Sequence, residues 1–158
     1  MNSVYQKTLS KEVSFNGIGL HSGKRSEIRL VSAKEDSGVI FKRIDLKKNN
    51  LINAKYSNVT SAKLCTTLEN EHGTKVSTVE HLLAAIYIAG IDNVIVEIDN
   101  EEVPIMDGSA KDFLETLGKH ELIVQKRKRN YLKVLKKIEL LDGERRISIE
   151  PSDTFEVD

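Results

Sequence analysis

The sequence predicts an α+β fold in which short strands outnumber helices. Apolar and polar residues alternate over residues 27–31 and 93–98, as in strands with one buried face. Residues 77–89 have the helical period instead, and the apolar face of that helix is suited to cover a sheet. We therefore expect a sheet with a helix packed against one of its faces.

The N-terminal part is expected to form strands joined by turns. Residues 5–15 are a weak strand candidate, and three glycines within seven residues mark a tight turn at 17–23. Further short strands are expected at 38–43 and 63–68, separated by a polar stretch that includes residues 47–50.

The helix at 77–89 has recognisable ends. Ser77 and Glu80 have the spacing of a capping box, in which two side chains satisfy the free N–H groups of a helix start. Gly90 stands where a glycine commonly ends a helix.

Both faces of this helix are rich in apolar residues. The face expected to cover the sheet carries Val79, Leu82, Leu83 and Ile86. The opposite face carries His81, Ala84, Ala85 and Ile88. Because a helix that is apolar all round is normally buried all round, we expect something to pack against this second face.

The C-terminal part is expected to start a second unit. Residues 108–117 form a shorter expected helix, and the basic run 126–129 an expected solvated linker. Residues 131–141 and 145–150 form an expected hairpin around Asp142-Gly143, and two strands alone are marginal in water. The expected division is a first domain at 1–125, a linker at 126–130 and the incomplete start of a second domain at 131–158.

Composition argues against several classes of function. Lys+Arg and Asp+Glu number 24 each, so no net charge favours nucleic acid or an anionic membrane. Tryptophan is absent and aromatic residues make up 5%, which argues against a stacking platform for single strands. The single cysteine, Cys65, cannot form an internal disulfide, and the longest apolar run, 82–89, is too short to span a bilayer. With no secretory signal in view, we expect a cytoplasmic protein that binds no nucleic acid.

The pair Glu80-His81 is the main candidate for chemistry. A histidine in an interface is a possible metal ligand, and a neighbouring carboxylate can act as a base toward the attacking water. Two alternatives stay open from the residues alone: Glu80 as part of a capping box, and His81 as a structural histidine. No His-Glu-x-x-His motif is present, and the other histidines have no metal-ligand spacing among themselves.

Four motifs occur in an order that resembles one enzyme family. They lie at residues 17–23, 64–66, 77–82 and 102–110. In this order they resemble the N-terminal half of the UDP-3-O-acyl-N-acetylglucosamine deacetylases, zinc enzymes of lipid A biosynthesis. The resemblance implies a two-layer sandwich of a mostly antiparallel sheet covered by helices, followed by the first strands of a second, similar domain.

The resemblance also implies roles for individual residues. His81 matches a zinc ligand, and Glu80 matches the general base that helps remove the N-acetyl group of UDP-3-O-acyl-N-acetylglucosamine. His21, Leu64 and Cys65 match positions at or near the substrate. The family's other two ligands come from a His-Lys-x-x-x-Asp motif, which is absent here. We therefore expect an N-terminal portion of the enzyme that lacks its C-terminal half, is inactive alone, and associates with itself through the second face of the helix.

A stand-alone binding domain of the same fold is the alternative. The intact Glu80-His81 pair argues against it, because a scaffold has no need of that pair. A cysteine hydrolase is disfavoured since no base is apparent for Cys65, and a serine hydrolase lacks the Gly-x-Ser-x-Gly elbow.

Overall fold

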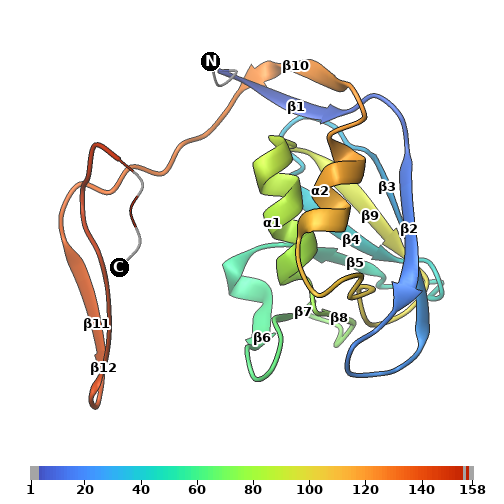
Figure 1. Ribbon diagram of the computed structural model, residues 1–158, viewed down its shortest axis with the longest axis horizontal. Coiled ribbons are helices and arrows are strands. Elements are labelled where there is room, and N and C mark those ends of the chain that lie inside the picture. The colour runs from blue at the N-terminus through green and yellow to red at the C-terminus, as the bar shows by residue number, and fades with distance from the viewer. Residues whose placement is uncertain (1–3, 155, 157–158) are drawn as a thin grey trace.

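The computed structural model of the chain describes residues 4–154 and 156; residues 1–3, 155, 157 and 158, at the ends of the two expected domains, lie outside the described residues. Its centre is a five-stranded sheet in the order β2-β3-β9-β4-β5 (Figure 1). The strands are β2 (Val13–Ile18), β3 (Arg25–Ser32), β9 (Val94–Ile98), β4 (Val39–Arg43) and β5 (Leu51–Asn53). Neighbours are antiparallel except β4 and β9, so the expected mostly antiparallel sheet is confirmed.

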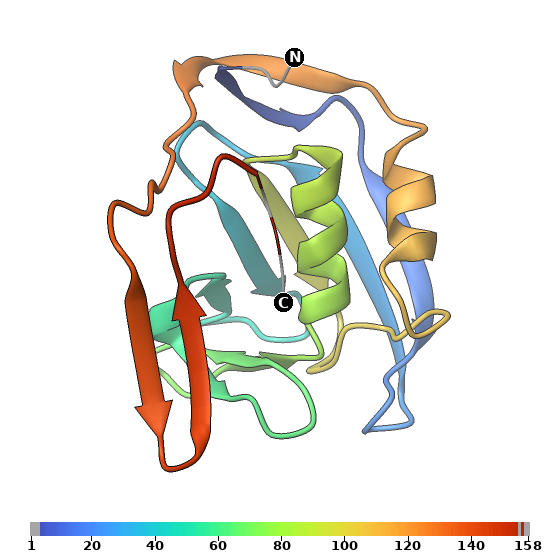
Figure 2. The ribbon, with the colours of Figure 1, turned by 60° about the vertical axis from the view of Figure 1, so that its left-hand side comes forward.

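Two helices cover one face of this sheet. Helix α1 (Glu80–Ala89) and helix α2 (Lys111–Leu117) lie side by side on that face (Figures 1 and 2). Alternate strand residues such as Leu30 and Val96 are fully buried beneath them. Phe15 of β2 meets Phe113 of α2 edge to face, with ring centroids 5.0 Å apart. The expected two-layer arrangement is thus confirmed. Within the described chain, no helix is long and apolar enough to cross a membrane; the cytoplasmic location stays a prediction.

The remaining strands form three smaller antiparallel sheets. The first pairs β1 (Tyr5–Leu9) with β10 (Leu122–Lys128). The second contains β6 (Val59–Ser61), β7 (Thr67–Glu69) and β8 (Lys75–Ser77), and follows the 3-10 helix η1 (Tyr56–Asn58). The third is the hairpin of β11 (Ile138–Asp142) and β12 (Arg145–Ile149). The strand expected at 5–15 is therefore two strands, β1 and the start of β2, which belong to different sheets.

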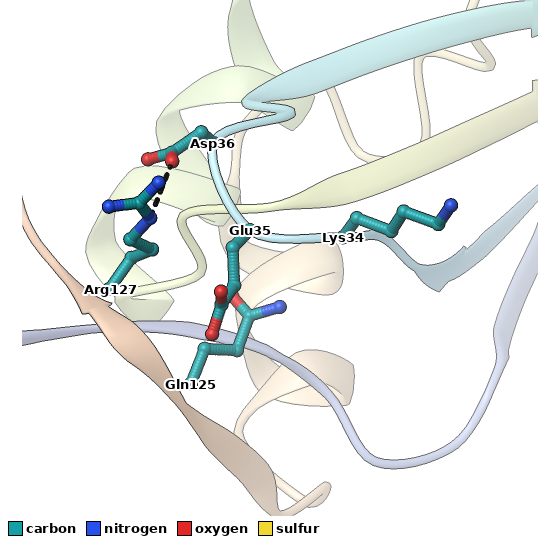
Figure 3. A pocket seen from close by; sticks show the side chains of 5 residues that line it. All are labelled: Lys34, Glu35, Asp36, Gln125 and Arg127. Atoms are coloured by element: carbon teal, nitrogen blue, oxygen red, sulfur yellow. Dashed lines mark ion pairs between the residues drawn. The ribbon is translucent and has the colours of Figure 1, made fainter.

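The basic run expected to be a linker is mostly part of a strand. Residues 126–128 end β10 and lie beside β1. Two arginines of the basic run form ion pairs: Arg127 with Asp36 at 3.3 Å, and Arg129 with Asp92 at 2.8 Å. Figure 3 shows the first of these pairs in a hollow lined by Lys34, Glu35, Asp36, Gln125 and Arg127. Residues 126–128 are exposed, as expected, but they belong to a strand. The linker at 126–130 and the domain boundaries stay a prediction.

The predicted hairpin forms around Gly143, but its first strand, expected at 131–141, begins only at Ile138, so the expectation is wrong for 131–137. Its turn contains Gly143 with a φ of 60°, a backbone conformation that favours glycine. Every residue of β11 and β12 is exposed, and Figure 1 shows the hairpin set apart from the central sheet. One of its faces presents Ile138, Leu140, Ile147 and Ile149.

The capping box predicted for α1 is wrong. Ser77 is the last residue of β8, and the helix starts only at Glu80, with Val79 at the cap position and no side-chain cap. The Ser77 hydroxyl donates instead to the backbone carbonyl of Glu101 at 3.3 Å. Gly90 does end the helix, with a left-handed φ of 75°.

The faces of α1 are as predicted except at Ala85. His81 is half-buried, while Ala84 and Ile88 are exposed. Ala85 was expected on this outer face but is fully buried. Residues three apart in a helix share a face, so Ala85 lies with Leu82 in the core.

A carboxylate on the outer face of the central sheet holds three strands in register. Glu97 of β9 accepts hydrogen bonds from Lys42 of β4 at 2.9 Å and from Arg29 of β3 at 3.0 Å. Glu97 lies directly opposite both residues in the strand register. The hydrogen bond from Lys42, followed by those from Arg29, holds the pKa of Glu97 below its ordinary 4.5.

We expect Glu97→Gln to lower the free energy of unfolding at neutral pH by about 1–3 kcal/mol, because it removes charge-assisted hydrogen bonds. A depressed folded-state pKa stabilises the fold above the unfolded pKa, and this stabilisation is lost as the pH falls through the folded pKa. The difference between wild type and variant should therefore shrink on acidification below 4.5. Urea unfolding at a series of pH values measures it.

The matched control is Glu12→Gln, which removes a 63% exposed carboxylate that pairs with the same Arg29. It should have a smaller effect than Glu97→Gln, because an exposed pair is screened by solvent. Equal effects of the two variants, or an effect of Glu97→Gln that does not change with pH, would contradict this role of Glu97.

Candidate functional site

The four sequence motifs, which are far apart in the chain, meet at the N-terminal end of α1. In Figure 1 this is the lower end of the helix, where the turn between β2 and β3 and the loop between β6 and β7 also lie. The opposite end of the helix faces the β1-β10 ribbon, where Arg129 donates to the carbonyl of Gly90.

Glu80 connects the helix to the motif at 64–66. It is the first residue of α1 and is half-buried, and its Oε2 accepts a hydrogen bond from the backbone N–H of Thr66 at 3.1 Å. The chain turns at Leu64, whose φ of 69° lies in the left-handed region, so the strand expected at 63–68 is wrong for residues 63–66, and β7 begins only at Thr67. Among the described residues, Oε1 of Glu80 has no hydrogen-bond partner, which leaves one carboxylate oxygen open.

His81 follows Glu80 on the first turn of the helix and is half-buried. Two other histidines lie elsewhere in the contacts that they make. His21 is exposed on the turn after β2, and His72 pairs with Glu71 at 3.4 Å. In the part of the chain that the structure describes, no group of three or more His, Cys, Asp or Glu side chains is arranged to hold a metal ion. The role of His81 as a metal ligand stays a prediction.

Leu64 and Cys65 directly precede the residue that binds Glu80. The Leu64 side chain is 83% exposed, and Cys65 is half-buried with its thiol 3.9 Å from the hydroxyl of Thr67. No imidazole or carboxylate of the described chain is within hydrogen-bond distance of this thiol. The substrate contacts predicted for both residues stay predictions.

Glu102 joins the glycine-rich turn to the segment that enters α1. It is only 2% exposed. Its Oε1 accepts hydrogen bonds from the backbone N–H of His21 at 2.9 Å and from the hydroxyl of Thr78 at 3.0 Å, and its Oε2 accepts one from the N–H of Ser22 at 2.8 Å. This role of Glu102 was not predicted from the sequence, because the only signal was membership of the 102–110 motif, and the turn lies about 80 residues earlier.

The surroundings of Glu102 favour its charged form. Burial by itself raises the pKa of this carboxyl, but hydrogen bonds from Ser22, His21 and Thr78 outweigh it and hold the pKa below the ordinary 4.5. The groups that bind the carboxylate are N–H and O–H donors without formal charge. Glu102 is therefore a buried anion satisfied by dipoles alone.

Close backbone approach explains two glycines of the turn. A side chain at Gly19 would collide with the carboxylate of Glu102, and a Cβ at Gly17 would lie 3.0 Å from the Cβ of Pro104. The backbone N–H of Ile105 also donates to the carbonyl of Ile18 at 3.0 Å. The motif at 102–110 thus lies along the motif at 17–23, and a side chain at Gly19 would have to displace the carboxylate of Glu102.

Known proteins are similar to this chain over nearly its whole length. The family model described as UDP-3-O-acyl N-acetylglycosamine deacetylase matches residues 6–158. The chain belongs to this family. Relatives named UDP-3-O-acyl-N-acetylglucosamine deacetylase are 43% identical over 154 residues in Syntrophotalea carbinolica, 42% over 154 residues in Citrifermentans bemidjiense and 39% over 155 residues in Shewanella frigidimarina. Each match covers 98% of this chain and 50% or 51% of the relative, so the chain spans about half the length of the curated relatives it matches.

Proposed function

We propose that this chain supplies the Glu80-His81 part of the active site of a zinc-dependent deacetylase. The proposed reaction removes the N-acetyl group of UDP-3-O-acyl-N-acetylglucosamine, the substrate in the relatives' names. The observation that carries the proposal is the meeting of four motifs at one end of α1, through the hydrogen bonds of Glu80 and Glu102. Membership of the family supports it.

His81 is the proposed zinc ligand of this chain. Its imidazole is half-buried, and its neighbours on the same helix face, Ala84 and Ile88, are exposed, so further ligands can approach from that side. Zinc, when bound, polarises the amide carbonyl and makes the attacking water more acidic. Because catalytic zinc usually has three protein ligands, we propose that sequence outside these 158 residues supplies the others.

Glu80 is the proposed general base. The hydrogen bond from Thr66 fixes one carboxylate oxygen, and the other is open to accept a proton from the water that attacks the acetamide carbon. The carbon–nitrogen bond then breaks, acetate leaves, and the glucosamine nitrogen takes up a proton as the free amine. We propose that a residue outside this chain donates that proton, and that His21, Leu64 and Cys65 contact the substrate.

The direct test compares the 158-residue chain with a longer protein that contains it and a His-Lys-x-x-x-Asp motif. The longer protein should convert UDP-3-O-acyl-N-acetylglucosamine to the free amine, lose this activity to a chelator and regain it with zinc. The 158-residue chain alone should be inactive, because it supplies one ligand. Equal activity of both proteins would contradict a divided site, and no activity in the longer protein would favour the alternative of a binding domain.

We also infer that isolated copies of the chain associate through the outer face of α1. Tyr87 is 85% exposed and Ile88 is 61% exposed, with the 83% exposed Leu64 on the loop at the start of the helix. Exposed apolar patches usually find a partner. Sedimentation at micromolar concentration should detect a dimer that Ile88→Glu dissociates.

Association through the hairpin is the competing route. It would be broken by Ile147→Glu on the exposed face of β12 and left intact by Ile88→Glu. A monomeric wild-type chain would contradict association by either route.

A further inference from the structure

Glu102 is the one buried carboxylate of the site that the proposed reaction does not use. Its two oxygens bind donors from two separate segments: His21 and Ser22 on the glycine-rich turn, and Thr78 just before α1. Thr78 stands two residues before Glu80 in the chain. The carboxylate is thus the direct connection between the turn that carries His21 and the start of the catalytic helix.

The side of Glu102 that faces α1 is held firmly. The backbone N–H of Ser77 donates to the carbonyl of Glu101 at 2.8 Å, and the N–H of Val103 donates to the carbonyl of Ser77 at 3.1 Å. Thr78 itself has a φ of 57°, which is unfavourable for a β-branched residue and requires surroundings that hold it. The hydroxyl of Thr78 on Glu102 is one of the contacts that do so.

The turn on the other side depends more on Glu102. Within the turn, Gly19 donates to Lys24 at 2.9 Å and Gly23 donates to Gly19 at 3.0 Å, both through the backbone. The N–H groups of His21 and Ser22, at the tip between these bonds, point instead to the carboxylate. The side chain of His21 is exposed, so its position follows from where its backbone is held.

We infer that Glu102 is a positioning residue of the deacetylase: it holds His21 at a set place relative to Glu80 and His81. This inference rests on the proposed function, and it concerns a residue that makes no contact with the reacting atoms. A glutamine is a close match in size but has one acceptor oxygen and one NH2 group. Glu102→Gln therefore leaves either Ser22 or the pair His21 and Thr78 without an acceptor.

The first test needs no activity and uses the 158-residue chain. Amide hydrogen exchange should be about tenfold or more faster at His21 or Ser22 in Glu102→Gln, since a hydrogen bond to a charged group is lost. Amides of the central strands β3 and β9 should keep their wild-type rates. The control is Glu101→Gln, the same change at a 72% exposed neighbour, which should leave the turn unchanged.

Unchanged exchange at both His21 and Ser22 in a folded Glu102→Gln chain would overturn the inference, as would faster exchange spread evenly over the core. Should Glu102→Gln fail to fold, Glu102→Asp keeps the charge and withdraws it by one methylene. The same local loss of protection is then expected, and wild-type exchange at both amides would again count against the inference.

The second test uses the longer, active protein and asks whether Glu102 acts through His21. Glu102→Gln should raise KM with a smaller change in kcat, and the double variant with His21→Ala should have the KM of His21→Ala alone. Two residues that act independently would have additive effects, and additivity would refute action through His21. If the longer protein has no deacetylase activity, the proposed function fails, and hydrogen exchange still decides whether Glu102 holds the turn.

Discussion

Replacing Glu80 with glutamine in the longer, active protein should lower kcat by about two to four orders of magnitude, the usual effect of losing a general base. Glutamine keeps an oxygen that can accept the hydrogen bond from Thr66, so the loop at 64–66 should stay in place. The substitution thereby removes the basic group and retains the structural contact. Steady-state kinetics measure kcat, and thermal unfolding checks that the fold is intact.

The control for this experiment is Glu115→Gln on α2, where the carboxylate is 60% exposed and far from any proposed role in the reaction. It should leave kcat close to wild type. A near-normal kcat for Glu80→Gln would leave Glu80 only its contact with Thr66. The structure already excludes the other structural role, since α1 has no capping box.

Introducing glutamate at Ala85 should destabilise the chain by roughly 4–5 kcal/mol, whereas the same change at Ala84 should cost about 0.5 kcal/mol or less. Ala85 is fully buried beside Leu82, where a larger and charged side chain has neither space nor a partner. Ala84 is the next residue along the helix and is exposed. Urea unfolding of the two variants measures the difference.

This pair of variants tests the observed orientation of α1. A domain is stable by about 5–15 kcal/mol, so the expected loss at Ala85 unfolds a visible fraction of the chain. Similar stability of Ala85→Glu and Ala84→Glu would show that the helix is turned differently. The comparison also explains why a charge at Ala85 is unsuited to test self-association, and why Ile88 is the position to use.

Features whose signal is local could be predicted from the sequence. Alternation identified β9, and Gly90 identified the end of α1, because a left-handed residue there needs a glycine within the same turn of chain. The pair Asp142-Gly143 identified the hairpin of β11 and β12 for the same reason. The order of four short motifs identified the family, which the family match then showed.

Features that depend on distant partners could not be predicted in this way. The basic residues 126–128 form a strand because β1, more than a hundred residues earlier in the chain, lies beside them. Ala85 is buried because the helix presents a wider face to the sheet and α2 than the four residues expected to face the sheet had indicated. The capping box had the right spacing, but the backbone at Ser77 is engaged in pairing with the segment at 101–103 and does not enter the helix.

The candidate site likewise combines features that have a local signal in the sequence with features that depend on distant partners. The sequence by itself determined which residues are proposed to carry the chemistry, Glu80 and His81, because those residue types sit in a motif that neighbours in the chain define. Only the tertiary structure decided what holds them: Thr66 on Glu80, and Glu102 between His21 and Thr78. A hydrogen bond between residues about 80 positions apart depends on how the chain folds back on itself, and no local pattern of side chains predicts such a contact.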